Sequence, residues 1–84
     1  MLKVGAVVRS IAGRDKDRFY LVVKLQEGAA WVADGKLRKL AAPKRKNVKH
    51  LSATRQEINL NAVATDKKLR GALAPLNDAF STQP

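Results

Sequence analysis

The most informative feature of this 84-residue sequence is what it lacks: it has no cysteine and only one histidine. Without cysteine the chain has no disulfide, no thiolate ligand for zinc and no thiol nucleophile. One imidazole alone does not make a typical transition-metal site. No Ser–His–Asp arrangement, phosphate-cradling glycine loop or acidic pair in an apolar setting is recognisable either. We therefore expect a protein that is not an enzyme and that carries no metal or cofactor.

Acidic residues and long apolar stretches are also scarce. Seven Asp and Glu residues stand against seventeen Lys and Arg residues, which leaves a formal net charge of +10 and a sequence pI near 10.6. Such a field favours a polyanionic partner, and nucleic acid is the usual one for so basic a domain. The apolar runs are short and none follows Met1, so we expect neither a membrane span nor a signal peptide. The sequence thus predicts a soluble, cytoplasmic protein.

The positive charge is concentrated in one part of the chain. Residues 36–55 contain no acidic residue, whereas the segments before and after them mix both signs. The basic residues of this stretch are Lys36, Arg38, Lys39, Lys44, Arg45, Lys46, Lys49 and Arg55. An ordinary solvated surface usually intersperses the two signs, so this stretch is the first candidate for an anion-binding surface.

The first half of the chain has the pattern of β-strands. Residues 4–11 follow a period of two but are apolar at both parities, which suits a small barrel. Residues 18–25 are rich in aromatic and β-branched residues, and a turn at Gly28 leads into the apolar residues 29–33. Asp34-Gly35 is typical of a two-residue hairpin turn, so we expect the return strand over residues 36–40. Short strands over 48–51 and 57–60 would complete a mainly β barrel of about five strands.

The tail has a different period. Thr65 is a suitable helix cap, and leucines and alanines recur at helical spacing from Leu69 onward. Gly71 and Pro75 weaken a helix, so we expect a short one that ends or kinks near Ala74. The sequence predicts that residues 1–64 form the barrel with its basic loop. It also predicts that residues 65–84 form a helical tail that packs on the same domain through its leucines, not on RNA.

Several segments resemble a known family. Residues 4–23, with Gly13 between two hydrophobic strands and a basic loop after it, resemble a KOW motif. The segments 32–35, 44–46, 47–51 and 65–70 follow in the order found in one ribosomal family. Over nearly its whole length the chain is similar to small bacterial KOW-domain RNA-binding proteins. Those proteins are themselves similar to the fourteenth large-subunit protein of archaeal and eukaryotic ribosomes. KOW proteins often have a second glycine where this chain has Asp17.

This resemblance implies an SH3-like barrel that contacts structured ribosomal RNA, in a ribosomal or ribosome-associated protein. Lys and Arg side chains bind phosphates with release of counterions, and loop residues beside them contribute polar contacts. The candidate RNA-binding residues are Arg14, Lys16, Arg18, Lys36, Arg38, Lys39, Lys44, Arg45, Lys46, Asn47, Lys49 and His50. We expect the protein to be monomeric on its own and to have no small-molecule substrate.

Some of these residues also have a structural interpretation. The basic side chains of the 14–18 loop either bind phosphates or pair with the two aspartates between them. Asn47 suits the cap of a turn better than a base contact. His50 is expected to be a packed structural residue, and Trp31 and Val22 are expected to fill the barrel interior. The alternative function is a protein-interaction adaptor, for which so few aromatic residues offer little exposed apolar surface.

Overall fold

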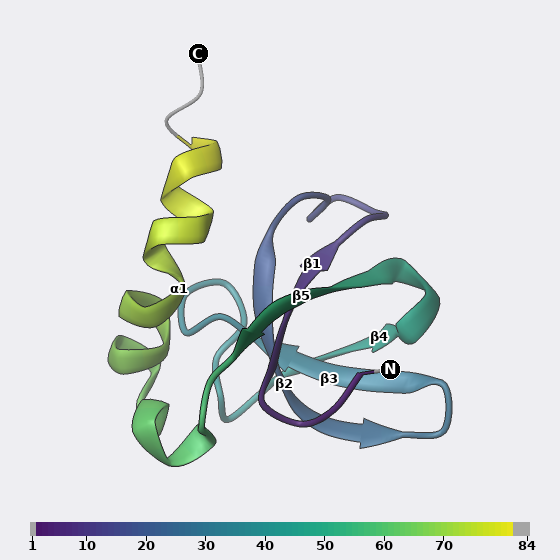
Figure 1. Cartoon of the computed structure of the whole chain (residues 1–84), viewed down its shortest axis with the longest axis horizontal. Helices are drawn as coiled ribbons and strands as arrows, with labels where there is room; N and C mark the ends of the chain where they lie inside the picture. The colour runs from purple at the N-terminus through teal and green to yellow at the C-terminus, as the bar shows by residue number, and fades with distance from the viewer. Residues whose placement is uncertain (1, 82–84) are drawn as a thin grey trace.

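Five antiparallel strands form one curled sheet in the computed structural model, which describes residues 2–81 (Figure 1). The strands are β1 (Ala6–Ser10), β2 (Phe19–Gln26), β3 (Ala29–Ala33), β4 (Lys44–Asn47) and β5 (Leu51–Glu57). Their order in space is β4-β3-β2-β1-β5. The edge strands β4 and β5 do not pair with each other within residues 2–81, so the sheet is barrel-like but not closed. The predicted mainly β class, with about five strands and a C-terminal helix, is confirmed.

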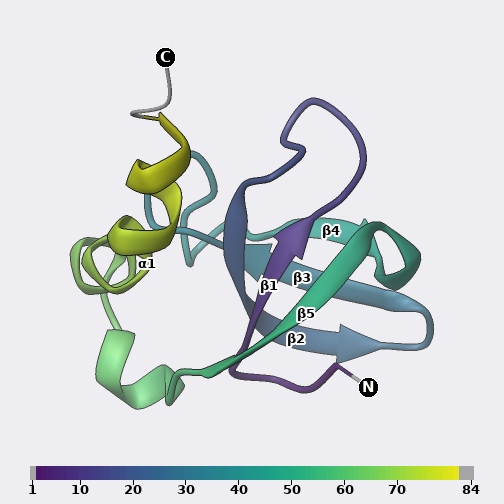
Figure 2. The same ribbon diagram turned by 45° about the horizontal axis from the view of Figure 1, so that its top comes forward.

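Residues 2–81 also contain three helical segments. The 3-10 helix η1 (Val48–His50) joins β4 to β5, and a second 3-10 helix, η2 (Leu60–Val63), leads into helix α1 (Asp66–Ser81). Helix α1 lies beside the sheet, while the β2–β3 hairpin points away from it on the opposite side (Figures 1 and 2). The helix therefore covers only part of the outer face of the sheet.

Both faces of the sheet carry apolar side chains, because the inner face lines the barrel core and helix α1 packs against part of the outer face. The inner face encloses the barrel core, where Val8, Tyr20 and Val22 are buried. The outer face carries Val7 and Leu21, which pack with Leu69 and Leu73 of α1 in a second apolar cluster. The period-two pattern of β1, apolar at both parities, thus reflects one face in the barrel and one face under the helix.

The connection between β3 and β4 is longer than the predicted two-residue turn. The prediction of a return strand over residues 36–40 is wrong. The buried carboxylate of Asp34 accepts hydrogen bonds from the backbone N–H groups of Lys36 (2.9 Å) and Arg38 (2.8 Å), which turns this segment into a loop. Gly35 has a φ of +77°, and a Cβ there would lie 2.2 Å from the Asp66 carbonyl oxygen. The strand that pairs with β3 begins only at Lys44.

Two further strand predictions are wrong. Residues 48–50 form η1 instead of a closing strand, because the Asn47 side chain accepts a hydrogen bond from the Lys49 N–H and caps a helical turn. The residues after Glu57 form no strand either, since Asn59 caps η2 in the same way. The short side chain of an asparagine can thus divert the chain into a turn at both places.

Helix α1 begins as predicted but ends later. Thr65 caps it by accepting a hydrogen bond from the Lys68 N–H at 3.2 Å, and Leu69 and Leu73 are fully buried. Of the two predicted outcomes near Ala74, an end or a kink, the end is wrong, because the helix continues through Pro75 to Ser81.

A side-chain clamp beyond Pro75 explains this continuation. The Phe19 N–H donates to Asn77 Oδ1 at 2.7 Å, and Asn77 Nδ2 donates to the Phe19 carbonyl at 3.2 Å. Leu76 also packs against the outer apolar cluster. These contacts offset the hydrogen bond that proline removes from the helix.

Candidate nucleic-acid interface

The loop between β1 and β2 is anchored by a buried network around Asp15. Lys46 Nζ donates to Asp15 Oδ1 at 2.7 Å and to Ser10 Oγ at 2.8 Å. Ser10 Oγ and Tyr20 Oη also donate to the Asp15 carboxylate, each at 2.8 Å. The Lys46 side chain is only 6% exposed. Lys46 is therefore a positioning residue for the loop, which corrects its assignment as a surface contact for phosphate.

The hydrogen bonds of this network shift the pKa values of Asp15 and Tyr20 in opposite directions. Burial works to raise the pKa of Asp15, but the hydrogen bond from Lys46, together with those from Tyr20 and Ser10, outweighs it and lowers the pKa to about 2. Burial, with the hydrogen bond to the Asp15 carboxylate, raises the pKa of Tyr20 well above its ordinary value. Asp15 is thus ionised and Tyr20 neutral over the whole physiological range.

A second buried carboxylate joins the β1–β2 loop to the β3–β4 loop. The residue Asp34 is 1% exposed, and Arg18 Nε donates to its Oδ2 atom. Burial works to raise the pKa of Asp34, but the backbone N–H groups of Arg38 and Lys36 and the Arg18 side chain outweigh it and lower the pKa. Arg18 therefore holds the two loops together as well as lining the surface between them.

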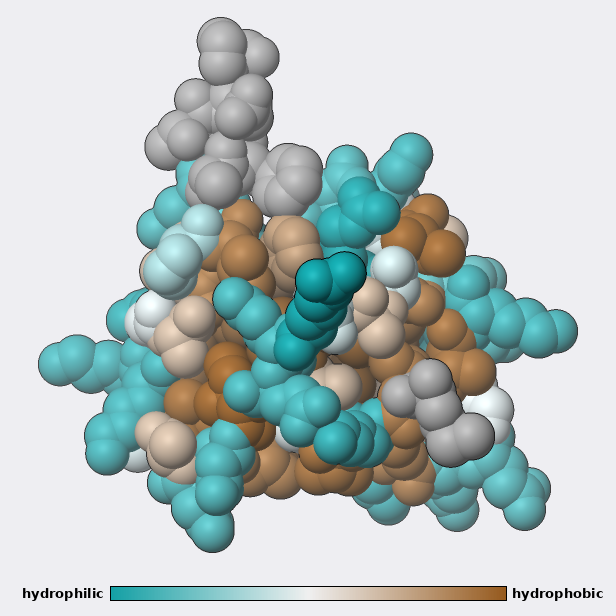
Figure 3. Space-filling view, in the orientation of Figure 1, coloured by the Kyte–Doolittle hydropathy of each residue, from teal (hydrophilic) through white to brown (hydrophobic). Residues whose placement is uncertain are grey.

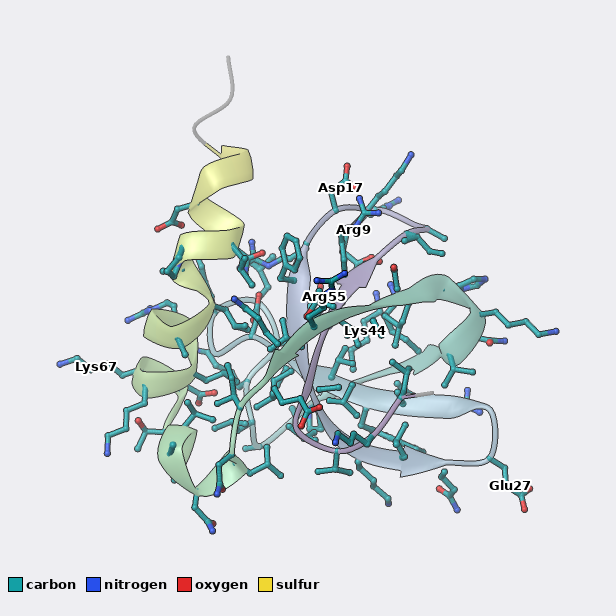
Figure 4. All side chains as sticks on the ribbon, in the orientation of Figure 1. Arg9, Asp17, Glu27, Lys44, Arg55 and Lys67 are labelled. Atoms are coloured by element: carbon teal, nitrogen blue, oxygen red, sulfur yellow. The ribbon has the colours of Figure 1, made fainter. Side chains whose placement is uncertain are left out.

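The other acid of the β1–β2 loop is also paired. Asp17 lies at a φ of 74°, the only positive φ of a non-glycine residue within residues 2–81. Its carboxylate accepts a hydrogen bond from Arg9 Nη1 at 2.9 Å, and Figure 4 shows the two side chains close together. The predicted pairing of the loop's basic side chains with these two aspartates is therefore wrong, because both acids pair with cations outside the loop and Arg18 pairs with Asp34. Arg14 and Lys16, by contrast, are exposed and form no ion pair with any part of the chain that the structure describes.

These anchored loops border an open groove of about 710 Å³. Its basic lining residues are Arg14, Lys16, Arg18, Arg38 and Lys44. The groove also contains Tyr20, the exposed Leu37 and Asn77 of α1. Because Asp15 and Asp17 already have cationic partners, the lining has an excess of positive charge that can attract phosphate.

A second groove, of about 560 Å³, continues from the first along α1, and the two share Arg18 and Asn77. Lys36 from the β3–β4 loop lines it, together with Lys67 and Arg70 from α1. The two helical cations did not appear among the sequence candidates, since the tail as a whole has no net charge. Their i, i+3 spacing, which places them on one side of a helix, was the signal that could have revealed them.

Strand β4 divides the most basic run of the sequence between two faces. Lys44 and Lys46 point toward Asp15, with Lys44 Nζ 4.0 Å from Asp15 Oδ2, whereas Arg45 lies opposite Trp31 on the outer face. Residues 44–46 therefore do not lie in the predicted basic loop but on a strand, where side chains alternate between the two faces.

The remaining candidates lie elsewhere. Lys39, Lys49 and His50 are exposed and line neither of the two grooves. The structural interpretation of Asn47 as a turn cap is confirmed. His50 is exposed, so the expectation of a packed histidine is wrong. The grooves thus bring together Arg14, Lys16, Arg18, Lys36, Arg38 and Lys44.

Trp31 is not in the barrel interior, and this prediction is wrong, whereas Val22 is fully buried as expected. Ala30 and Val32 face the barrel core, so alternation places Trp31 between them on the outer face. There the ring is partly exposed, with Lys24 Nζ 4.8 Å and Arg45 Cζ 5.8 Å from its centroid.

Polar and apolar side chains are interspersed on the face of the molecule shown in Figure 3. In the space-filling view, hydrophilic side chains project around the outline and across the centre, with apolar surface between them (Figure 3). None of the helices in residues 2–81 is both long enough and apolar enough to cross a membrane. Within the same residues no group of three or more histidine, aspartate or glutamate side chains could hold a metal ion.

No protein-family model matches the chain, and no curated protein matches it. The features of the chain that bear on its function are therefore the charge, the ion pairs and the shape of the two grooves.

Proposed function

We propose that the protein binds RNA, with structured ribosomal RNA as its partner, through the two basic grooves between its loops and α1. The observation that carries this proposal is the pairing of the charges. The acids Asp15 and Asp17 are neutralised by Lys46 and Arg9, which leaves Arg14, Lys16 and Arg38 without an ion-pair partner within residues 2–81. Cations without an acidic partner are available to bind phosphates, which releases the counterions of the nucleic acid.

The shape of the site favours a folded RNA backbone. The two grooves share Arg18 and Asn77, so cations from the β1–β2 loop, the β3–β4 loop and α1 line adjoining surfaces, with Asp34 and Asp78 among them in the second groove. Phosphate contacts of this kind position a nucleic acid without reading its sequence, which suits recognition of shape. Arg18 is fixed by Asp34, so part of this surface is pre-organised before any ligand arrives.

The left-handed conformation of Asp17 supports the resemblance to KOW proteins. This residue adopts a φ of 74° at the position where those proteins often have a glycine. Aspartate is one of the few other residues that tolerate this conformation. We therefore propose a ribosome-associated or large-subunit-type protein of the KOW kind.

The test compares two triple variants that lose the same charge. One is Arg14→Ala/Lys16→Ala/Arg38→Ala, in the groove; the control is Lys3→Ala/Arg55→Ala/Lys68→Ala, on exposed positions outside it. Binding of a labelled RNA hairpin is measured by anisotropy over a range of salt concentrations. Each lost phosphate contact lowers the log–log salt slope by roughly 0.7 to 0.9, so the groove variant should flatten it by roughly 2.1 to 2.7. Equal effects in both variants would mean that only net charge matters.

The identity of the RNA needs a second measurement. Crosslinking in cells, followed by sequencing of the attached RNA, should give a peak in large-subunit ribosomal RNA. A peak in messenger RNA would contradict the ribosomal part of the proposal. The absence of any crosslinked RNA would favour the adaptor function instead.

A further inference from the structure

A row of three side chains crosses the outer face of the sheet, away from both grooves. Trp31 of β3 lies directly opposite Lys24 of β2 on one side and Arg45 of β4 on the other. Both cations lie within cation–π range of the indole ring. The row therefore combines one aromatic ring with two positive charges on adjacent strands.

The irregularity in β2 is what places Lys24 in this row. The pairing of β2 with β3 shifts between Val22 and Lys24, so that Lys24 faces Trp31 while Val23 still packs against the outer apolar cluster. A regular strand would have carried the lysine to the other face. The bulge thus brings a cation to the ring at a position where alternation alone would not.

The ring is accessible because α1 covers only the other end of this face. Ala33, two residues further along β3, is buried in the cluster beneath the helix, whereas Trp31 is partly exposed and does not belong to that cluster. The β2–β3 hairpin points away from α1 (Figure 2). Strand β4 is an edge strand, so a ligand can approach from its open side.

We propose that Trp31, with Lys24 and Arg45, forms a stacking site for a nucleobase of single-stranded RNA. The proposal depends on the proposed function for its ligand but uses a surface separate from the grooves. The indole and the planar Arg45 guanidinium that lies over it offer flat stacking surfaces for a base, and the two cations complement the flanking phosphates. The only acid in the β2–β3 hairpin, Glu27, lies in its turn, where Figure 4 shows it pointing outward.

The experiment uses the fact that Trp31 is the only tryptophan, so tryptophan fluorescence, excited selectively over that of Tyr20, reports on this site alone. The full chain is titrated with a short oligoadenylate, and with an abasic ribose-phosphate oligomer of equal length as the control. Stacking should quench the fluorescence with oligoadenylate but not with the abasic oligomer. In anisotropy measurements Trp31→Leu should weaken oligoadenylate binding at least fivefold, since stacking is worth roughly 1–3 kcal/mol per base, and Trp31→Phe should retain part of the affinity.

The outcomes separate this inference from the proposed function. If oligoadenylate binds without quenching, or if both oligomers quench equally, the stacking site does not exist although the protein still binds RNA. A folded Trp31→Leu variant with unchanged affinity overturns it as well. The groove variant Arg14→Ala/Lys16→Ala/Arg38→Ala should bind more weakly yet show the same quenching at saturation. If neither oligomer nor the RNA hairpin binds, the proposed function fails together with this inference.

Discussion

Lys46 and Arg45 are neighbours on β4, yet they differ in almost every property that matters for function. Lys46 points inward, is 6% exposed, and donates to Asp15 and Ser10. Arg45 points outward, is exposed, and lies over Trp31. The inner side of the sheet thus uses positive charge to hold a loop, and the outer side presents it to solvent. The comparison shows that a formal charge of +10 overstates the charge available to a ligand.

The largest expected effect is the loss of Lys46. Lys46→Ala removes a buried cation and leaves the half-buried carboxylate of Asp15 without its main partner, and breaking a buried ion pair typically costs about 3–5 kcal/mol. The free energy of unfolding, measured by urea denaturation, should fall by this order. The matched control is Arg45→Ala on the adjacent residue. Similar losses in the two variants would contradict the distinction between the two faces.

The second largest effect is expected at low pH, where protonation of Asp15 on the inner side of the sheet should lower the free energy of unfolding. The pKa of Asp15 is lowered from 3.8 to about 2, so its contribution is complete above about pH 4 and is lost as the pH falls toward 2. By linkage this contribution is on the order of 2 kcal/mol. Asp34, whose pKa is also lowered, adds in the same direction. Urea denaturation at a series of pH values should show this decline.

The control for the acid experiment is Asp15→Asn, which removes one of the two carboxylates. Its stability should depend less steeply on pH in this range, and Asp34, whose pKa is also lowered, should account for a remaining slope. An unchanged slope in the variant would show that Asp15 does not titrate as its hydrogen bonds imply.

A smaller effect is expected for the helical cations that line the second groove. Lys67→Ala/Arg70→Ala should flatten the salt dependence of RNA hairpin binding by roughly 1.4 to 1.8 on the log–log scale, if both side chains contact phosphate. The comparison is with Lys68→Ala/Arg55→Ala, which removes exposed charges outside both grooves. A larger effect of this second pair would place the RNA on another surface.

The smallest effect should come from Arg45 itself. Its contact with the indole ring is an exposed cation–π interaction, which contributes about 0.5–1 kcal/mol. Arg45→Ala should therefore lower the free energy of unfolding by no more than this, while Arg45→Lys should retain part of it. A loss as large as that of Lys46→Ala would mean that Arg45 supports the fold and not a ligand surface.

The sequence predicts the class of the fold well because period-two and helical patterns are local. The strands around Val8 and Val22 and the buried leucines of α1 follow from such patterns. The β3–β4 connection does not, since it depends on Asp34 being buried against Arg18, a residue sixteen positions away. Likewise, nothing in the local pattern indicates that Asn77 secures the helix beyond Pro75.

The candidate site was predictable in composition but not in arrangement. Half of the candidate residues do line the two grooves, because loops between strands of a small barrel lie near one another. The role of Lys46 could not be read from its neighbours, since it is determined by the distant Asp15. Trp31 was assigned to the wrong face because β3 is apolar at both parities, and only the position of α1 determines which side stays open.

Two side chains of α1 hydrogen-bond to backbone groups outside the helix, and together they fix the number of residues between them. Asp66 Oδ1 accepts from the Leu40 N–H at 2.7 Å, and Asn77 clamps Phe19 eleven positions later. Eleven residues make about three helical turns, so both clamps point to the same side. Inserting a single alanine between them would rotate Asn77 by about 100° and move it by about 1.5 Å. Insertions or deletions between Asp66 and Asn77 should therefore be tolerated when they amount to whole helical turns, and not when they amount to a single residue.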